Sequence, residues 1–217
     1  MDETERTSQD INAVAGRILG EGSAHKTQGD ERRRSLVQAA YQLIAEGGFE
    51  RLRTRDVAAR VGVNIATLHY YFPHKEDLIR GVVEYLLQQF MTAYLPGSPF
   101  EMKTPLEQIR GELAEMQYLL QEKPDIFIVL DELILRSLHD PAIGQMIGWL
   151  DVGWHSYLEQ VIRQGIEQGQ FRADLDPGSA ATWLILLTKG TTLHYMTNPG
   201  AIDFDRIRED VEHWLTG

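Results

Sequence analysis

The sequence predicts an all-α protein with a small N-terminal helix-turn-helix head and a larger helical domain behind it. Two short apolar stripes flank Gly62, between Thr54 and Phe72. Their intervals of three and four residues are typical of amphipathic helices, and helices this short are stable only when packed on others. A longer stripe from Ile143 to Val161 steps by four, three, four, three and four residues, which is the spacing of a helix-bundle seam.

The composition is that of an ordinary globular protein of one domain or two small ones. The chain has 217 residues and no cysteine, which excludes disulfides and thiolate metal sites. No apolar run approaches the ~20 residues that a membrane-spanning helix needs. The first ten residues are too acidic for a secretory signal. We therefore expect a cytoplasmic protein that does not associate with a membrane.

The net charge of −11 is distributed unevenly along the chain. Residues 26–80 carry ten Lys and Arg against seven Asp and Glu, a net of +3. Residues 81–217 carry nine against twenty, a net of −11. A basic region around the predicted head is what contact with phosphates requires, and the acidic remainder would repel DNA. The charge pattern therefore indicates that one face of the protein binds nucleic acid.

The N-terminal part leads into the first helix of the head. Residues 1–30 are polar and weakly periodic, so we expect a mobile arm, with docking on DNA or on a partner subunit as the alternative. Residues 32–46 form an amphipathic helix. Gly47 and Gly48 end this helix, and Phe49 returns to the core.

The two short helices have recognisable ends. Thr54 is placed to cap the first helix, and Gly62 follows where a left-handed residue ends a helix. Asn64 is placed to cap the second helix. Pro73 ends it, because proline has no N–H to donate.

The second short helix presents a small, polar and aromatic face. If Ile65, Leu68 and Phe72 face the core, a turn of about 100° per residue points Thr67 and Tyr70 most directly outward. Three further residues lie beside them: Ala66, His69 and Tyr71. Such a face can donate hydrogen bonds to phosphates, and Ala or Thr can contact a thymine methyl.

This stretch resembles the DNA-binding signature of the TetR family of transcriptional regulators. The similarity extends through the whole motif: Thr54, Val57–Ala58, Gly62–Val63, Thr67–Leu68, Tyr71–Phe72 and Lys75. The sequence departs from the family at His69, where the family usually has Tyr, and at Ala66, where it often has Gly. His69 can still donate a hydrogen bond, over a shorter reach and with more dependence on pH.

The resemblance implies a homodimer that presents two such helices to double-stranded DNA, at successive major grooves of a near-palindromic operator. Nine residues are the implied contacts to bases and phosphates: Thr54, Arg55, Asn64, Ala66, Thr67, His69, Tyr70, Tyr71 and Lys75. For Arg55, a position in a charged loop without DNA contact is an equally good interpretation. The sequence does not distinguish a repressor from an activator.

After a head at residues 31–80, residues 81–217 are expected to form a helical ligand-binding and dimerisation domain. A helix from Lys75 to about Tyr94 leads to a Pro/Gly-rich break at residues 95–104. Further helices are predicted at 105–121, 126–138, 141–168, 179–196 and 203–215. Residues 169–174 resemble the family's G-x-F-R-x-D connector, whose flanking helices form a four-helix bundle with a second subunit.

Charged residues on the predicted helix at 126–138 have two interpretations. Glu132 and Arg136 are four residues apart in the order that favours an ion pair on the surface. Asp131 lies among apolar residues. It either counters a cationic ligand or is solvated or paired with an arginine.

The resemblance also implies a small-molecule effector, and the aromatic residues favour an apolar or aromatic one. The candidate lining residues are Met116, Phe127, Leu130, Met146, Trp149, Trp183 and Tyr195, although core packing alone explains most of them. No cofactor or metal site is predicted, because there is no Gly-rich phosphate loop and His155 with Glu159 lacks a third ligand. A DNA-binding dimer without a ligand and, less favoured, a helical enzyme remain the alternatives.

Overall fold

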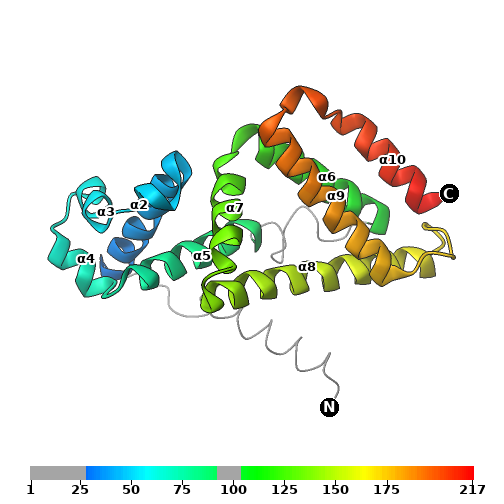
Figure 1. Ribbon diagram of the computed structural model, residues 1–217. Coiled ribbons are helices and arrows are strands. Elements are labelled where there is room, and N and C mark those ends of the chain that lie inside the picture. The colour runs from blue at the N-terminus through cyan, green and yellow to red at the C-terminus, as the bar shows by residue number, and fades with distance from the viewer. Residues whose placement is uncertain (1–27, 92–103) are drawn as a thin grey trace, which may run out of the picture. The chain divides into compact units, whose positions relative to one another are not determined.

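The computed structural model describes residues 28–91 and 104–217, and all regular structure within these ranges is helical (Figure 1). The helices are α2 (Gln28–Arg51), α3 (Thr54–Val61), α4 (Ile65–Tyr71), α5 (Lys75–Met91), α6 (Pro105–Glu122), α7 (Asp125–Ser137), α8 (Pro141–Glu167), α9 (Pro177–Thr197), the 3-10 turn η2 (Pro199–Ala201) and α10 (Phe204–Thr216). The predicted all-α class is confirmed. Most of the expected arm at residues 1–30, the continuation of α5 to Tyr94 and most of the break at 95–104 lie outside the described residues.

The described residues form two compact units. The first contains α2 to α5 together with residues 128–149, and the second contains residues 104–127 and 150–217. Helices α7 and α8 each begin in one unit and end in the other. None of the described helices is long and apolar enough to cross a membrane.

The core of the first unit joins the three helices of the head to α5. Leu36 and Ile44 of α2, Leu68 of α4 and Leu78 of α5 are fully buried, and Phe72 closes the set at the end of α4. The guanidinium of Arg33 lies 5.1 Å from the centre of the Phe72 ring. The two short helices are therefore held by side chains of the longer ones, as their length requires.

Gly47 and Gly48 interrupt α2, as predicted, although one more helical turn follows. Gly48 has φ 69° and ψ −179°, a combination that is essentially restricted to glycine. The corner turns Phe49 toward α7. The Phe49 N–H donates to Glu132 Oε2 at 3.2 Å, and the guanidinium of Arg136 lies 5.3 Å from the centre of the Phe49 ring.

The predicted Glu132–Arg136 surface pair is therefore wrong. Both side chains turn to the same neighbour, Phe49, instead of to each other. The reason is tertiary: the Phe49 N–H lies in the broken part of α2 and needs an acceptor, and the Phe49 ring offers its face to a cation.

The turn between α3 and α4 forms as expected at Gly62, with one correction before it. Gly62 is left-handed, with φ 71° and ψ 33°, and its N–H donates to Ala59 O at 3.1 Å. Thr54, however, is the first helical residue and not the N-cap. The cap position belongs to Arg53, whose side chain makes no capping hydrogen bond.

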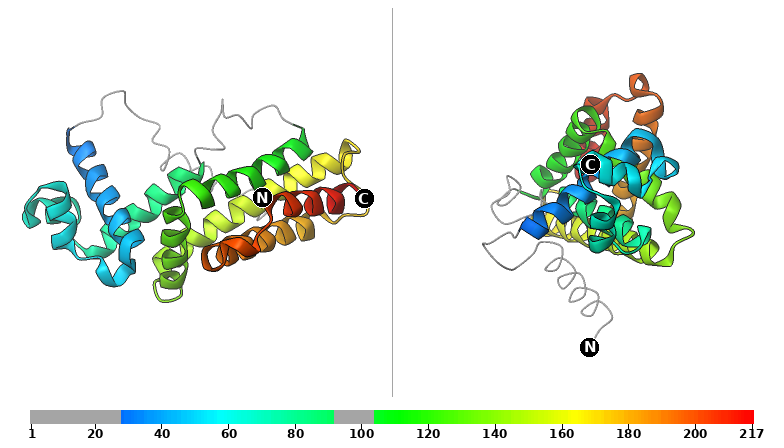
Figure 2. Two further views of the ribbon diagram at one scale, coloured as in Figure 1. Left: turned by 90° about the horizontal axis from the view of Figure 1, so that it is seen from above. Right: turned by 90° about the vertical axis from the view of Figure 1, so that its left-hand side faces the viewer.

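The second unit is a bundle in which α6, α8, α9 and α10 run alongside one another (Figure 2). Thr104 and Glu107 form a capping box at the start of α6. Arg110 of α6 donates two hydrogen bonds, of 2.7 and 2.5 Å, to the carboxylate of Glu212 on α10. These contacts fix the outer helices of the bundle around an apolar interior.

The connector between α8 and α9 depends on a close approach at Gly165. The Gly165 carbonyl accepts hydrogen bonds from the N–H groups of Gln170 and Phe171, and the Phe171 ring packs where a Cβ on residue 165 would stand. Asp176 then caps α9, so this helix begins at Pro177, two residues earlier than expected.

Candidate nucleic-acid interface and effector cleft

Asn64 starts α4 and fixes its first turn. Its Oδ1 accepts a hydrogen bond from the Thr67 N–H at 2.8 Å and from the Thr67 hydroxyl at 3.0 Å. The predicted cap at Asn64 is confirmed. Leu68 and Phe72 attach the helix to the core from one side. The opposite side of α4 is thereby presented to solvent in a defined orientation.

The exposed face of α4 differs from the predicted one in two residues. Tyr70 is 81% exposed, as expected, and Ala66 and His69 are exposed beside it. Thr67, expected to point outward, is half-buried with its hydroxyl bound to Asn64. Ile65, expected in the core, is 38% exposed.

The position of Ile65 follows from helix geometry. In an α-helix each Cα–Cβ bond tilts toward the N-terminus, so the side chain of the first residue extends past the end of the helix. Ile65 is the first residue of α4, whereas Leu68 lies one turn later and reaches the core. The spacing of three and four residues is therefore right for Leu68 and Phe72 and fails at the helix end.

Two aromatic side chains give the α4 face its shape. The rings of Tyr70 and Tyr71 lie 5.1 Å apart at an angle of 86°, an edge-to-face contact. Tyr71 is half-buried and supports the exposed Tyr70. Tyr70 therefore stands out from α4 with its hydroxyl free to turn toward solvent.

Some of the basic side chains of the head pair with carboxylates of the same unit, and others form no ion pair within the described residues. Arg60 makes two hydrogen bonds, of 2.7 and 2.8 Å, with Glu46 on α2, and this contact lowers the pKa of the Glu46 carboxyl. Arg80 pairs with Asp77 at 2.5 Å. Arg53 and Arg55 are exposed at the start of α3 and form no ion pair with any residue that the structure describes.

Two further residues expected to contact DNA, Thr54 and Lys75, also lie at helix starts in the head. Thr54 is half-buried at the first position of α3, and Lys75 is half-buried at the first position of α5. The N–H groups at the start of a helix favour anions. The head thus combines an exposed α4 face with cations and helix starts suited to phosphates.

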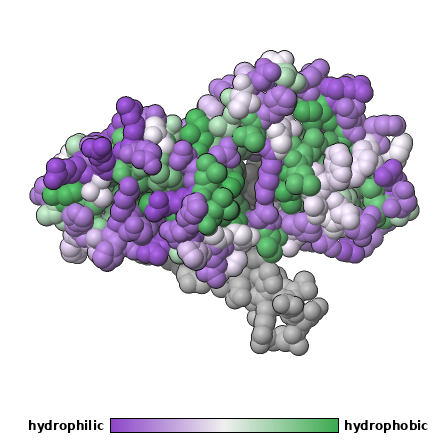
Figure 3. Space-filling model, viewed as in Figure 1, coloured by the Kyte–Doolittle hydropathy of each residue, from purple (hydrophilic) through white to green (hydrophobic). Residues whose placement is uncertain are grey.

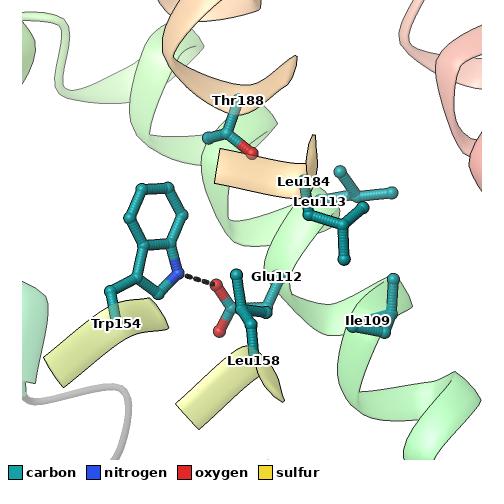
Figure 4. Close-up of a pocket in the computed structure, with 7 residues that line it drawn as sticks. All are labelled: Ile109, Glu112, Leu113, Trp154, Leu158, Leu184 and Thr188. Carbon is teal, nitrogen blue, oxygen red and sulfur yellow. Dashed lines mark hydrogen bonds between the residues drawn. The ribbon is translucent and has the colours of Figure 1, made fainter. Parts of the chain in front are cut away.

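The second unit contains a small cleft between α6, α8 and α9 (Figure 4). Its volume is about 10 Å³, room for about one water molecule. The lining is apolar except for two residues, and consists of Ile109, Glu112, Leu113, Trp154, Leu158, Leu184 and Thr188. The half-buried carboxylate of Glu112 accepts a hydrogen bond from the Trp154 indole N–H at 3.4 Å.

The charge of Glu112 affects its surroundings. The pKa of Tyr157 is raised, chiefly by burial and further by the negative charge of Glu112. The cleft combines an acidic group, an indole and apolar walls, a set that accommodates a ligand with an apolar body and a hydrogen-bond donor or positive charge.

None of the seven predicted ligand contacts lines this cleft. Met116 and Phe127 are buried, Leu130, Met146 and Tyr195 are half-buried, and Trp149 and Trp183 are exposed. Trp183 packs on Trp214 and Tyr195 on Phe204. Their role in ligand binding stays a prediction.

Sequence reasoning missed Glu112. The sequence did contain an indication of its position. Glu112 comes three residues after Ile109, so its carboxylate lies next to the apolar stripe of this amphipathic helix. Trp154 was expected in the bundle seam, where it does lie, but its indole N–H also needs an acceptor when it is buried.

Models of two protein families match the chain. Residues 36–82 match the bacterial regulatory proteins of the TetR family, and residues 105–217, just over half of the chain, match the C-terminal part of BetI-type transcriptional repressors. The chain belongs to the TetR family. The matched N-terminal range contains α3 and α4 in full, so the resemblance of this motif is confirmed.

Curated TetR-family relatives are repressors and regulators. KstR from Rhodococcus jostii is 31% identical over 58% of this chain, and the match covers 56% of the relative's own length. The fatty acid metabolism regulator protein of Bacillus subtilis is 26% identical over 65% of this chain and 71% of its own. The family and these relatives support a DNA-binding transcriptional repressor and not an enzyme.

Solved structures share the fold over most of the chain. A TetR transcription regulator from Haloarcula marismortui superposes with a TM-score of 0.75 at 23% identity, covering 85% of this chain and 96% of its own. A transcriptional regulator from Saccharomonospora viridis in complex with choline has a TM-score of 0.70 at 25% identity, with coverage of 86% and 96%. Regulators of this family bind DNA and usually act as dimers with small-molecule effectors.

Proposed function

We propose that this TetR-family chain is a homodimeric repressor that binds a near-palindromic operator through α4 and leaves it when a small molecule enters the cleft around Glu112. The observation that carries the DNA-binding part is the α4 face. Tyr70, His69 and Ala66 are exposed on a helix that Asn64 caps and Leu68 anchors. In helix-turn-helix proteins the second helix enters the major groove with such a face.

The direct test is binding of the purified protein to DNA flanking its own gene, with salt titrated. Tyr70→Ala should weaken binding at least tenfold, because Tyr70 is the most exposed side chain of the face and carries a hydroxyl that reaches phosphates or bases. Tyr118→Ala is the matched control, since Tyr118 is an exposed tyrosine on α6 of the second unit.

Two outcomes would count against this proposal. Equal binding by both tyrosine variants would remove α4 from the interface. A folded protein that yields no consensus in random-site selection would refute operator binding altogether. Binding to selected sites but not to its own flanking DNA would place the operator elsewhere in the genome.

The proposed dimer uses the exposed apolar face of α9. Three large apolar residues on this face are exposed: Trp183, Leu186 and Leu193. Gly190 lies between the two leucines, and a Cβ added there would meet nothing within 4 Å. Apolar surface is visible over α9 in Figure 3. These positions follow one another at intervals of three and four residues, so they form an apolar stripe along α9. Such a stripe is suited to packing against the same stripe of a second copy of the chain.

The dimer proposal is tested by the molar mass in solution. We expect a dimer for the natural chain and a monomer for the double variant Leu186→Glu/Leu193→Glu, because two buried charges in each subunit would face each other without partners. Leu135→Glu, at an exposed leucine of α7 outside this face, is the control. A dimer that persists in the double variant would exclude the α9 face.

The proposed effector has an apolar body and a cationic or donor group that faces Glu112. The cleft holds about one water as it stands, so a ligand binds only to a wider form. A ligand shifts the balance between two forms by its difference in affinity for them. We propose that widening displaces α8, one of the three helices that line the cleft. The first turns of this helix belong to the unit that contains α4. This gives the ligand a way to change the DNA-binding unit.

The names of the relatives supply two probes of different chemistry: choline, a cation, and a fatty acid, an anion. The carboxylate of Glu112 favours the cation. We expect choline to raise the melting temperature of the natural chain and not that of Glu112→Gln, which keeps the shape but loses the charge. The control is Glu122→Gln at an exposed position of α6. Stabilisation by the fatty acid alone would overturn the cationic assignment.

A further inference from the structure

The N-terminal end of α4 exposes an apolar pair, Ile65 and Ala66. Ile65 is 38% exposed and Ala66 is exposed next to it. They are the first two residues of the helix. In helix-turn-helix complexes the N-terminal residues of the second helix are the ones that contact base edges.

Most of Ile65 is covered by its neighbours, but the 38% that faces solvent is not needed to fill the core. Leu68 and Phe72 fill the core side of α4, and both are essentially inaccessible to solvent. The hydroxyl of Thr67 is bound to the Asn64 side chain, so this threonine is already used in fixing the helix start. A single exposed aliphatic side chain is ordinary on a protein surface. What distinguishes Ile65 is its place at the end of the helix that reads bases.

We propose that Ile65, with Ala66 beside it, contacts the methyl group of a thymine in each operator half-site and thereby determines the base at that position. This rests on the proposed operator binding by α4. The C5 methyl of thymine is the only alkyl group that the base pairs present in the major groove. Against any other base edge, the isoleucine would displace water from polar groups without replacing their hydrogen bonds.

The chemistry predicts how single changes in the DNA act. Deoxyuridine pairs with adenine as thymidine does and keeps the O4 acceptor, but it lacks the methyl group. Replacing the contacted thymidine by deoxyuridine should therefore remove the apolar contact alone. Burial of one methyl group corresponds to about a fourfold change in affinity per half-site.

The experiment starts from a consensus obtained by random-site selection with the full chain. Each thymidine of the half-site is then replaced in turn by deoxyuridine, and the dissociation constants of the natural chain, Ile65→Val and Ile65→Ala are measured. We expect one position per half-site where deoxyuridine lowers the affinity of the natural chain about fourfold. At that position the affinity of Ile65→Val should fall less, and that of Ile65→Ala, which keeps only the contact of Ala66, should fall least. Leu135→Ala, at an exposed leucine outside the head, should respond as the natural chain does.

The outcomes separate this inference from the proposal on which it rests. A consensus without a thymine, or a loss at deoxyuridine that is equal in the natural chain and Ile65→Ala, overturns the role of Ile65 while operator binding stands. The absence of any consensus refutes operator binding itself. Melting temperatures of the variants show whether Ile65→Ala is folded, and Ile65→Val keeps the test valid if it is not.

Discussion

The carboxylate of Glu132 accepts a hydrogen bond from the backbone N–H of Phe49, 83 residues away in the sequence, at 3.2 Å. The guanidinium of Arg136, one turn later on α7, lies over the ring of the same phenylalanine. Its Nε is buried without a hydrogen-bond partner among the described residues. The corner within α2 is thus held by α7.

Glu132→Ala should therefore lower the free energy of unfolding by about 1–2 kcal/mol, because the Phe49 N–H is left in a half-buried place without an acceptor. Glu132→Gln should lose less, since its amide oxygen can still accept. Chemical denaturation measures both, with Glu115→Ala on α6 as the control for removing a glutamate from a helix. An equal decrease in the free energy of unfolding in Glu132→Ala and Glu115→Ala would show that the hydrogen bond from Phe49 to Glu132 does not stabilise the fold.

Arg55→Ala should weaken DNA binding and make it less sensitive to salt. Arg55 is exposed at the start of α3 and is not engaged in an ion pair within the described residues. Loss of one phosphate contact reduces the slope of log K against log salt by about 1. Fluorescence anisotropy over a salt series measures this slope. Arg206→Ala, an exposed arginine on α10, should leave it unchanged. An unchanged slope in Arg55→Ala would show that Arg55, an exposed residue of α3, does not contact a phosphate.

Asp131→Asn should stabilise the protein at neutral pH. Burial raises the pKa of the Asp131 carboxyl above its ordinary value near 3.8. A raised pKa means that the protonated form suits the folded state. The contribution of the protonated Asp131 carboxyl to the free energy of unfolding is complete below about pH 3.8. This contribution is lost as the pH rises through the pKa of the folded state. Asparagine imitates the protonated form at all pH values.

The gain in Asp131→Asn should be well under about 1 kcal/mol, because the side chain is only half-buried and water screens its charge. Melting temperatures at pH 7 and near pH 3.5 measure it. The advantage over the natural chain should shrink at the lower pH. Glu122→Gln, at an exposed carboxyl, serves as the reference. An advantage that grows on acidification would have the wrong sign for a buried carboxyl.

Gly165→Ala should destabilise the second unit by about 1–3 kcal/mol, the usual effect of overpacking. A Cβ at this position would stand 2.1 Å from the Phe171 ring. The matched control is Gly153→Ala in the same helix, where a Cβ meets nothing within 4 Å. That substitution should stabilise by up to about 1 kcal/mol, because alanine favours a helix over glycine. Equal melting temperatures for the two variants would contradict the close approach of Phe171.

The sequence was sufficient at Gly62 and Asn64, two positions where one residue type has a strong local preference. Gly62 is left-handed and Asn64 caps α4, as their chemistry predicts. The helical class and the buried positions of Leu68 and Phe72 follow from periodicity. The family motif led to the same head, because its residues are close together along the chain.

The predictions that failed depend on contacts between distant parts of the chain or on positions at the end of a helix. Periodicity treats every turn alike, so it could not show that Ile65 extends past the helix end. The local rule for ion pairs four residues apart could not include Phe49 as a competing partner for Glu132 and Arg136. The cleft around Glu112 is made by three helices, and no single helix shows which of its polar residues meet the other two.

Helix α4 has only seven residues. The cap at Asn64 and the buried side chains of Leu68 and Phe72 hold it against the head as one cooperative unit. A segment this short has little helical stability of its own. Its amide protons are therefore released to solvent only when the packing of Leu68 and Phe72 opens. Hydrogen exchange in α4 should follow that of α2 and not the rapid fraying of a surface helix. The surface offered to DNA is consequently as ordered before the encounter as the core beneath it, and little conformational entropy remains to be lost on binding.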